Sequence, residues 1–324
     1  PFPVEVAPVE RVLSWTSGFI AADFECPPEH PRFRGSGPLL APCIAFPRTH
    51  ALFRVDGRGA LIVDPSVLVF LPQGSCYERS AVLGQPDKAE VLGVAPALFA
   101  RLGETLGCDL AALPAQTLPL SAAHLLQARR CFAALRRGEL EAEDAEDWLF
   151  DLLVSSLAER AGRREARPSA DSRMRRFLIE RARLAALRRP QGASPLTRVA
   201  AELGVSPAHL CRLSRAELGI PFGQYVMELR LRRALELMRD PALGLLDVAI
   251  ECGFSSHAHF TRSFAARFGE PPSQVRVALQ ARPHAGQQRG ADQTPSAGVG
   301  ARPVVRRPAS SRCPNSPGEA PSAR

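Results

Sequence analysis

Two short segments of this 324-residue chain place cationic, imidazole and hydroxyl side chains at helical spacing. The residues with this character are His209, Arg212 and Arg215 in the first segment and His257, Thr261 and Arg262 in the second. A guanidinium group can make two hydrogen bonds to guanine, while hydroxyl and imidazole groups reach base edges or phosphates. Such side chains on one face of a helix indicate contact with the major groove of a double-stranded nucleic acid.

The elements that would position these side chains form an internal repeat. The sequence VAAELGVS, which starts at Val199, returns as VAIECGFS from Val248. In each copy a glycine, Gly204 or Gly253, interrupts a helical pattern at a point where a tight turn favours positive φ. The repeat therefore predicts two pairs of helices, each joined by a glycine turn.

The second helix of each pair has its own start and stop signals. Ser206 is expected to cap the first of these helices, and either Ser255 or Ser256 is expected to cap the second. Gly219-Ile-Pro221 and Gly269-Glu-Pro271 then end them. Together these signals predict two helix-turn-helix units whose second helices enter the major groove. A protein-binding solenoid is the alternative, but two repeats are few for that architecture.

A spacer helix is predicted between the two units, over residues 222–240, with the sequence FGQYVMELRLRRALELMRD. About 18 residues at about 1.5 Å rise span about 27 Å. This length is close to one DNA turn of about 34 Å, so the two outer helices would enter successive grooves. The basic segment 160–189 is expected to add phosphate contacts.

The segment from about Asp171 to Arg276 resembles the DNA-binding domain of AraC-type transcriptional regulators. The resemblance rests on GFSSHAHFTRSFAARFGEPPSQVR and on the linker pattern LRLRRALELM. It implies that base-facing positions fall on Ala208, Cys211 and Arg212 and on His257, Ala258, Thr261 and Arg262. Ser214 and Val275 depart from the family, which usually has Phe at the first position and often has Tyr at the second.

The first half of the chain has a different pattern. Short apolar or alternating runs separated by turn residues predict an all-β unit over residues 11–94. The Asp56-Gly57 pair is the strongest hairpin signal. A short helical passage is expected at 95–113, and helices at 121–137 and 143–163. A leucine stripe on the last of these predicts packing within its own domain or a dimer seam, and it consists of Leu149, Leu152, Leu153 and Leu157.

This arrangement is similar to the N-terminal part of AraC-like proteins, a cupin-type β-barrel followed by helices that pair two subunits. The resemblance implies a homodimer and a small-molecule effector bound at the barrel mouth, with RNA polymerase as a further partner. Side chains considered for an effector pocket are Arg54, His50, Tyr77 and Glu78, although lone polar residues on strands are more often solvated. The expected fold class is α+β multi-domain, with a cupin-like domain, trailing dimerisation helices and two helix-turn-helix units on a linker helix.

The sequence lacks the motifs that would indicate a catalytic site or a metal site. The donors Cys26, His30, Cys43, His50 and Cys76 lack the His-x-His pair of enzymatic cupins, so no metal or other cofactor is expected. The cysteines also lack the close spacing of a zinc-bound DNA-repair site. A redox sensor at Cys26 and Cys43 is a weaker alternative, because nothing adjacent marks either thiol as acidified. The chain is expected not to be an enzyme.

Net charge and local composition predict the partner class, the domain boundaries and the cellular location. The chain has a formal net charge of +8, which favours a polyanionic partner. Domains are expected at 1–165, 166–281 and 282–324; the last, rich in Arg, Pro, Gly and Ser, is predicted to be disordered. A linker is expected at 163–172. No long apolar run or secretion signal is visible, which predicts a cytoplasmic protein without a membrane span.

Overall fold

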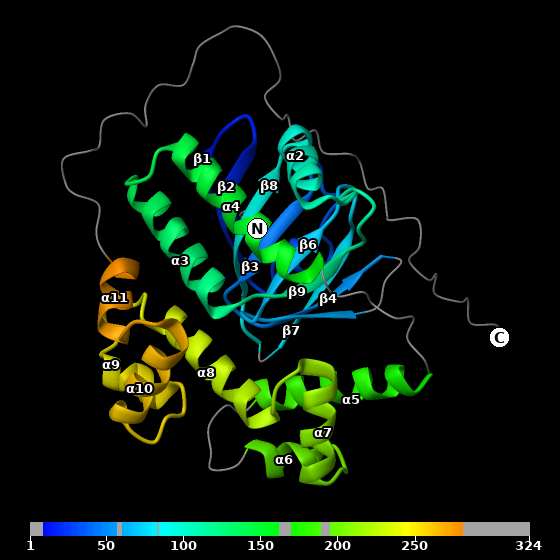
Figure 1. Ribbon diagram of the computed structural model, residues 1–324, viewed down its shortest axis with the longest axis vertical. Helices are drawn as coiled ribbons and strands as arrows, with labels where there is room; N and C mark the ends of the chain where they lie inside the picture. Colours follow the sequence, from blue (N-terminus) through cyan, green and yellow to red (C-terminus); the bar gives the residue numbers. More distant parts are fainter. Residues whose placement is uncertain (1–8, 57–59, 83, 162–169, 189–194, 281–324) are drawn as a thin grey trace, which may run out of the picture. The chain divides into compact units, whose positions relative to one another are not determined.

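The computed structural model describes residues 9–56, 60–82, 84–161, 170–188 and 195–280. Its N-terminal part contains two antiparallel sheets (Figure 1). The larger sheet consists, in spatial order, of β1 (Glu10–Trp15), β2 (Phe19–Cys26), β8 (Asp87–Val94), β3 (Cys43–Pro47), β6 (Val67–Leu71) and β9 (Gln116–Pro119). The smaller sheet consists of β5 (Ala60–Val63), β4 (Ala51–Val55) and β7 (Tyr77–Ala81). Most of the linker expected at 163–172 and all of the tail at 282–324 lie outside the described residues.

The hairpin expected at Asp56-Gly57 joins two neighbouring strands. β4 and β5 pair antiparallel, with Arg54 opposite Ala60, although residues 57–59 of the turn are not described. The prediction of a mixed α+β chain with an N-terminal sheet domain and a helical C-terminal region is confirmed, although α1 between β2 and β3 and β9 after α2 were not expected from the sequence.

A cation lies inside the core that the two sheets share. Arg79 on β7 has a buried guanidinium, whose carbon lies 4.6 Å from the ring centroids of both Phe24 and Tyr77. Its Nε donates to Asp87 at 2.6 Å, and its Nη2 donates to the hydroxyl of Tyr77 at 2.6 Å. A buried charge is tolerated only when it is paired and hydrogen-bonded. This region between the sheets is therefore filled by side chains.

Three longer helices and the single turn α1 (Pro31–Arg34) complete the N-terminal part. The longer helices are α2 (Pro96–Leu106), α3 (Ala122–Arg137) and α4 (Ala142–Ala161). Ser121 caps α3, since its Oγ accepts from the backbone NH of His124 at 3.1 Å. The leucine stripe of α4 packs inside the chain, where Leu149, Leu152 and Leu153 are buried.

The rest of the described chain is helical. It consists of α5 (Ala170–Arg188), α6 (Pro195–Glu202), α7 (Pro207–Leu218), α8 (Phe222–Leu237), α9 (Leu245–Glu251), α10 (His257–Phe268) and α11 (Pro272–Gln280). The spacer helix predicted from the sequence corresponds to α8. Both α10 and α11 contact α3, and apolar residues of these elements belong to one core.

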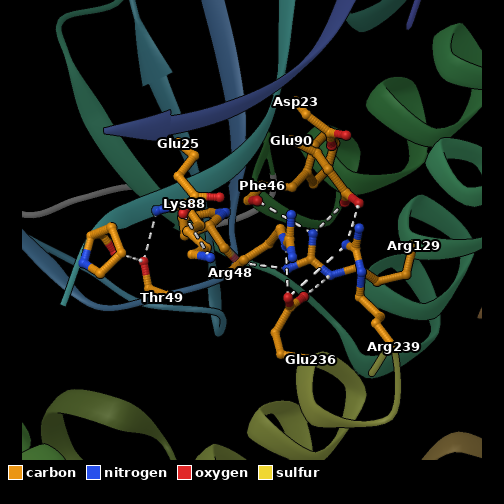
Figure 2. A network of polar contacts seen from close by, with 12 residues as sticks. Asp23, Glu25, Phe46, Arg48, Thr49, Lys88, Glu90, Arg129, Glu236 and Arg239 are labelled. Carbon is orange, nitrogen blue, oxygen red and sulfur yellow. Dashed lines mark hydrogen bonds and ion pairs between the residues drawn. The ribbon is translucent and has the colours of Figure 1, made fainter. Parts of the chain in front are cut away.

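A buried ion network joins α8 to the sheet domain (Figure 2). At its centre lies Glu90 on β8, which has no exposed side-chain surface. Its carboxylate accepts hydrogen bonds from Arg129 and Arg136 of α3, and from Arg239, just past the end of α8, at 3.2 Å. Burial alone would raise the pKa of Glu90, but the surrounding guanidinium groups lower it to about 2. Glu90 is therefore held as a carboxylate by residues from both parts of the chain.

Two residues of α8 itself, Glu236 and Arg232, extend this contact. Glu236 accepts from Nε of Arg48 at 2.6 Å and lies 3.3 Å from Nε of Arg129. Arg232 donates to the backbone oxygens of Pro65 at 2.9 Å and Leu120 at 2.7 Å. Buried guanidinium groups that bind specific carbonyl oxygens fix how the helix lies against the loops of the sheet domain.

The basic segment at 160–189 is used differently from the expectation. Arg183 on α5 is buried, and its Nη2 lies 2.7 Å from Oδ2 of Asp64. Its Nε also donates to the hydroxyl of Tyr225 at 3.0 Å. Arg175 pairs with Glu217 at 3.1 Å. Arg183 is therefore a structural cation, and the prediction that this segment supplies phosphate contacts is wrong for that residue.

Candidate nucleic-acid interface

The first helical pair consists of α6 and α7. Gly204, in the turn between them, has φ of 67°, a conformation that costs a side-chain-bearing residue about 1 kcal/mol or more. The Oγ of Ser206 accepts from the backbone NH of His209 at 3.1 Å, which fixes the start of α7. Leu210 is fully buried and anchors the inner face of the helix. The turn, the cap and the anchor together leave the opposite face of α7 in solvent.

The second pair, α9 and α10, repeats this construction. Gly253 has φ of 77°, and the cap is Ser256, whose Oγ accepts from the backbone NH of His259 at 3.2 Å. Three phenylalanines at four-residue spacing are buried on the inner face of α10, with ring centroids 5.6 and 4.5 Å apart in turn; they are Phe260, Phe264 and Phe268. Aromatic side chains at this spacing lie along one side of a helix and contact one another. They orient the remaining faces of α10 away from the core.

The polar residues singled out from the sequence lie on the outer faces of the two helices. Exposed in the structure are Ser206, His209, Arg212 and Arg215 on or beside α7 and Ser256, His257 and Arg262 on or beside α10. Arg212 and Arg262 each occupy the sixth position of a twelve-residue helix, so the two units present a guanidinium at matching places. Thr261 is only partly exposed, and its Oγ1 is shielded from solvent without a hydrogen-bond partner among the described residues.

The other positions that the family resemblance implied differ in exposure. Ala208 and Ala258 are exposed, while Cys211 is partly buried. Ser214, where the family usually has Phe, is fully buried, and its Oγ donates to the backbone oxygen of Ile220 at 2.7 Å. This hydroxyl ties α7 to the turn that follows it. Val275 is also fully buried.

The sequence of this region matches a known family. Residues 199–278, which contain both helical pairs, match the family model described as a helix-turn-helix domain. A solved AraC-type DNA-binding domain from Chromobacterium violaceum is 30% identical, covers 35% of this chain and 99% of its own, and has a TM-score of 0.30. The chain carries an AraC-type helix-turn-helix domain.

Two curated regulators match a segment of about a quarter of this chain. The regulator YfiF of Bacillus subtilis is 40% identical over 81 residues, which is 25% of this chain and 26% of its own. The regulator GlxA of Rhizobium meliloti is 38% identical over 91 residues, 28% of this chain and 27% of its own. This chain thus matches about a quarter of the length of these relatives. ToxT of Vibrio cholerae covers 82% of this chain and 100% of its own, with 11% identity and a TM-score of 0.33.

Outside the AraC-type domain, the four side chains considered for an effector pocket do not converge. Arg54 and Glu78 are exposed and lie 3.7 Å from each other, while the hydroxyl of Tyr77 is bound to Arg79 inside the core. His50 instead lines a cavity beside α8. The charged residues of α8 were not singled out from the sequence as a contact with the sheet domain, because in sequence they look like an ordinary solvated helix face.

The donors considered for a metal or a redox site are also dispersed. Within the described residues, no three His, Cys, Asp or Glu side chains are grouped as metal ligands. Burial raises the pKa of Cys26, and it raises the pKa of Cys43 to about 12, so neither thiol is acidified. In the part of the chain described here, no helix combines the length and the apolar character needed to cross a bilayer.

Proposed function

We propose that this protein is a sequence-specific transcriptional regulator that reads two successive major grooves of double-stranded DNA. The observation that carries the proposal is that Arg212 on α7 and Arg262 on α10 are both exposed at matching helix positions. The helix between them, α8, is by contrast largely buried. A helix of this size fits a groove about 12 Å wide. Arg212 and Arg262 are the residues proposed to bind guanine edges.

Several side chains around these arginines are proposed to fix the helices on the duplex. His209 and Arg215 flank Arg212, and His257 lies on the first turn of α10. The hydroxyls of Ser206 and Ser256 already accept backbone NH groups, so their proposed DNA contact is to phosphates near the helix starts, where the helix dipole also favours negative charge. Thr261 is proposed to contact a base through its methyl group, because its hydroxyl oxygen is shielded.

The AraC-type domain also suggests roles for the other parts of the chain, an oligomeric state and partners, and we include these in the proposal. The N-terminal domain is proposed to be a cupin-like module over residues 1–165 that serves as sensor and dimerisation unit, with the DNA-binding domain at 166–281 and a separate segment at 282–324. A homodimer in the cytoplasm, with RNA polymerase as a partner at the promoter, fits a regulator of this kind. The proposal includes no catalytic step.

Selection of bound DNA from a random pool tests this function, with wild type compared with Arg262→Ala. We expect the variant to lose about 1–3 kcal/mol of binding free energy and its preference at one base position. The matched control is Arg267→Ala on the same helix, because Arg267 is directed to α8, where its Nε lies 2.6 Å from Glu228. The control should keep the base preference. Equal weakening of Arg262→Ala on all DNA sequences would show that Arg262 contacts only phosphate.

A further inference from the structure

Two helices of the C-terminal helical region each expose a pair of large apolar side chains. The pair on α5 is Met174 and Phe177. The pair on α9 is Leu246 and Ile250, and all four side chains are more than half exposed. The members of a pair are three or four positions apart, so they share one face of their helix. Neighbouring apolar side chains left in solvent often mark a contact with another protein.

The helix-turn-helix construction does not require the apolar pair on α9. The internal repeat aligns Leu246 with Thr197 and Ile250 with Ala201 of α6. Both residues of α6 are exposed as well, so the same face of the first unit lies in solvent without large apolar side chains. The packing of the second unit therefore does not explain why Leu246 and Ile250 are apolar.

The two apolar faces carry opposite charge. Asp247 and Glu251 are exposed beside the pair on α9, and neither carboxylate forms an ion pair with a described residue. Arg181 is exposed on α5, one turn beyond Phe177, and its guanidinium carbon lies 5.8 Å from the centroid of that ring. Arg181 has no carboxylate partner within the described part of the chain. The face on α9 is thus apolar and anionic, and the face on α5 is apolar and cationic.

DNA is a poor partner for the face on α9. Its two carboxylates would be repelled by phosphates, although the face belongs to a unit that presents Arg262 on the neighbouring helix. A cationic and apolar protein surface complements this face in both respects. The exposed side of α5 is such a surface, and it is part of the same chain.

The two faces lie on different helix-turn-helix units. α5 packs against α6 and α7 and shares a core with the first half of α8. α9 packs against α10 and shares a core with the second half of α8. α8 has 16 residues and is therefore about 24 Å long. Within one chain both faces remain exposed, so the complementary partner of each face is found on a second copy of the chain.

We propose that copies of this protein bound at adjacent DNA sites contact each other head to tail, with the α9 face of one copy against the α5 face of the next. The contact is heterologous, because it joins two different surfaces. It therefore requires sites in direct repeat, where the second unit of one copy lies next to the first unit of its neighbour. In an inverted repeat two like faces would meet, and their equal charges would repel. The proposal rests on the DNA-binding function proposed above.

The small size of this contact decides where it acts. Two apolar side chains and one or two charges on each side amount to much less than the roughly 1,000 Å² that a stable interface in solution buries. Copies held on one duplex have a high effective concentration, so a weak contact is enough to couple their binding. Coupling between two binding events typically changes affinity about 5- to 150-fold. The contact is therefore expected to appear as cooperative binding to DNA.

Titration of the full-length protein against three duplexes tests this contact. One duplex carries a single site obtained by the selection described above, and the others carry two such sites in direct or inverted repeat, with centres separated by whole turns of about 10.5 bp. We expect the second copy to bind the direct repeat at least about tenfold more tightly than the first, with no such gain on the inverted repeat. Equal affinities at both positions of the direct repeat, or equal cooperativity on both repeats, would overturn the proposal alone. A lack of binding to the single site would refute the DNA-binding function and this proposal with it.

Charge-swap variants assign the cooperativity to the two faces. Arg181→Glu alone and Glu251→Arg alone should each abolish most of it, whereas the double variant, which restores opposite charges, should recover it. Leu246→Thr combined with Ile250→Ala gives α9 the side chains that α6 carries at the matching positions, and it should lose cooperativity while keeping single-site affinity. Glu104→Arg is the control, because it makes the same chemical change at an exposed residue of α2. Wild-type cooperativity in either single variant, or no recovery in the double variant, would refute the contact.

Discussion

Replacing Glu90 by Gln tests the buried network most directly, because glutamine has nearly the shape of a protonated glutamic acid. The carboxylate has a pKa of about 2 in the folded protein against an ordinary value of 4.5. At about 1.4 kcal/mol for each pKa unit, this difference corresponds to about 3 kcal/mol of stability at pH 7. Removing one partner of a buried ion pair typically costs about 3–5 kcal/mol, so the two lines of reasoning agree.

The pH dependence follows from the sign of the pKa change. A lowered pKa means that the stabilisation is fully present above about pH 4.5 and is lost as the pH falls toward about 2. The difference in unfolding free energy between wild type and Glu90→Gln should therefore be about 3 kcal/mol at neutral pH and should shrink below about pH 4.5. Urea unfolding followed by circular dichroism at several pH values measures this difference.

Glu25→Gln provides the matched control. Glu25 pairs with Lys88 at 2.8 Å on the surface, and its side chain is 54% exposed. A surface pair of this kind contributes little, so this variant should unfold within about 0.5–1 kcal/mol of wild type. If Glu90→Gln unfolded at the same denaturant concentration as Glu25→Gln, the argument that Glu90 joins α3 to α8 through its charge would be refuted.

Two further substitutions test the local construction of the helix-turn-helix units. Ser256→Ala should destabilise the protein by about 1 kcal/mol through loss of the cap of α10, whereas Ser255→Ala should be nearly neutral. Thermal melts compare the two variants directly, and equal melting temperatures would argue against the cap. Ser214→Ala should cost about 0.5–1.5 kcal/mol, because it removes the partly buried hydrogen bond from the Ser214 hydroxyl to the backbone oxygen of Ile220. Chemical unfolding measures that loss, and a wild-type midpoint would show that the hydrogen bond contributes nothing.

The helix-turn-helix units were predictable because their signals are local. A glycine with positive φ, a capping serine and an inward phenylalanine lie within a dozen residues of one another, as in Gly253, Ser256 and Phe260. The choice between Ser255 and Ser256 as the cap depended on backbone geometry, which the sequence leaves open. Ser214 shows the same limit, because its carbonyl partner is six residues away in a turn.

The contact between α8 and the sheet domain was not predictable in this way. Arg129 lies 39 residues after Glu90 and Arg239 lies 149 residues after it, and each looks like a surface charge in its own segment. Only the fold brings them together and removes them from water. The same reason explains Arg183, which sits in a basic segment but pairs with Asp64, 119 residues earlier.

The position of α8 has a mechanical consequence. One end of this helix leads from α7, and the other leads through residues 238–244 into α9 and α10. The middle and the C-terminal end of α8 are held by Pro65, Leu120 and Arg48 of the sheet domain. Because α7 packs against α8 while α10 also packs against α3, a small displacement of α8 would change the orientation of α7 relative to α10, and with it the spacing between Arg212 and Arg262.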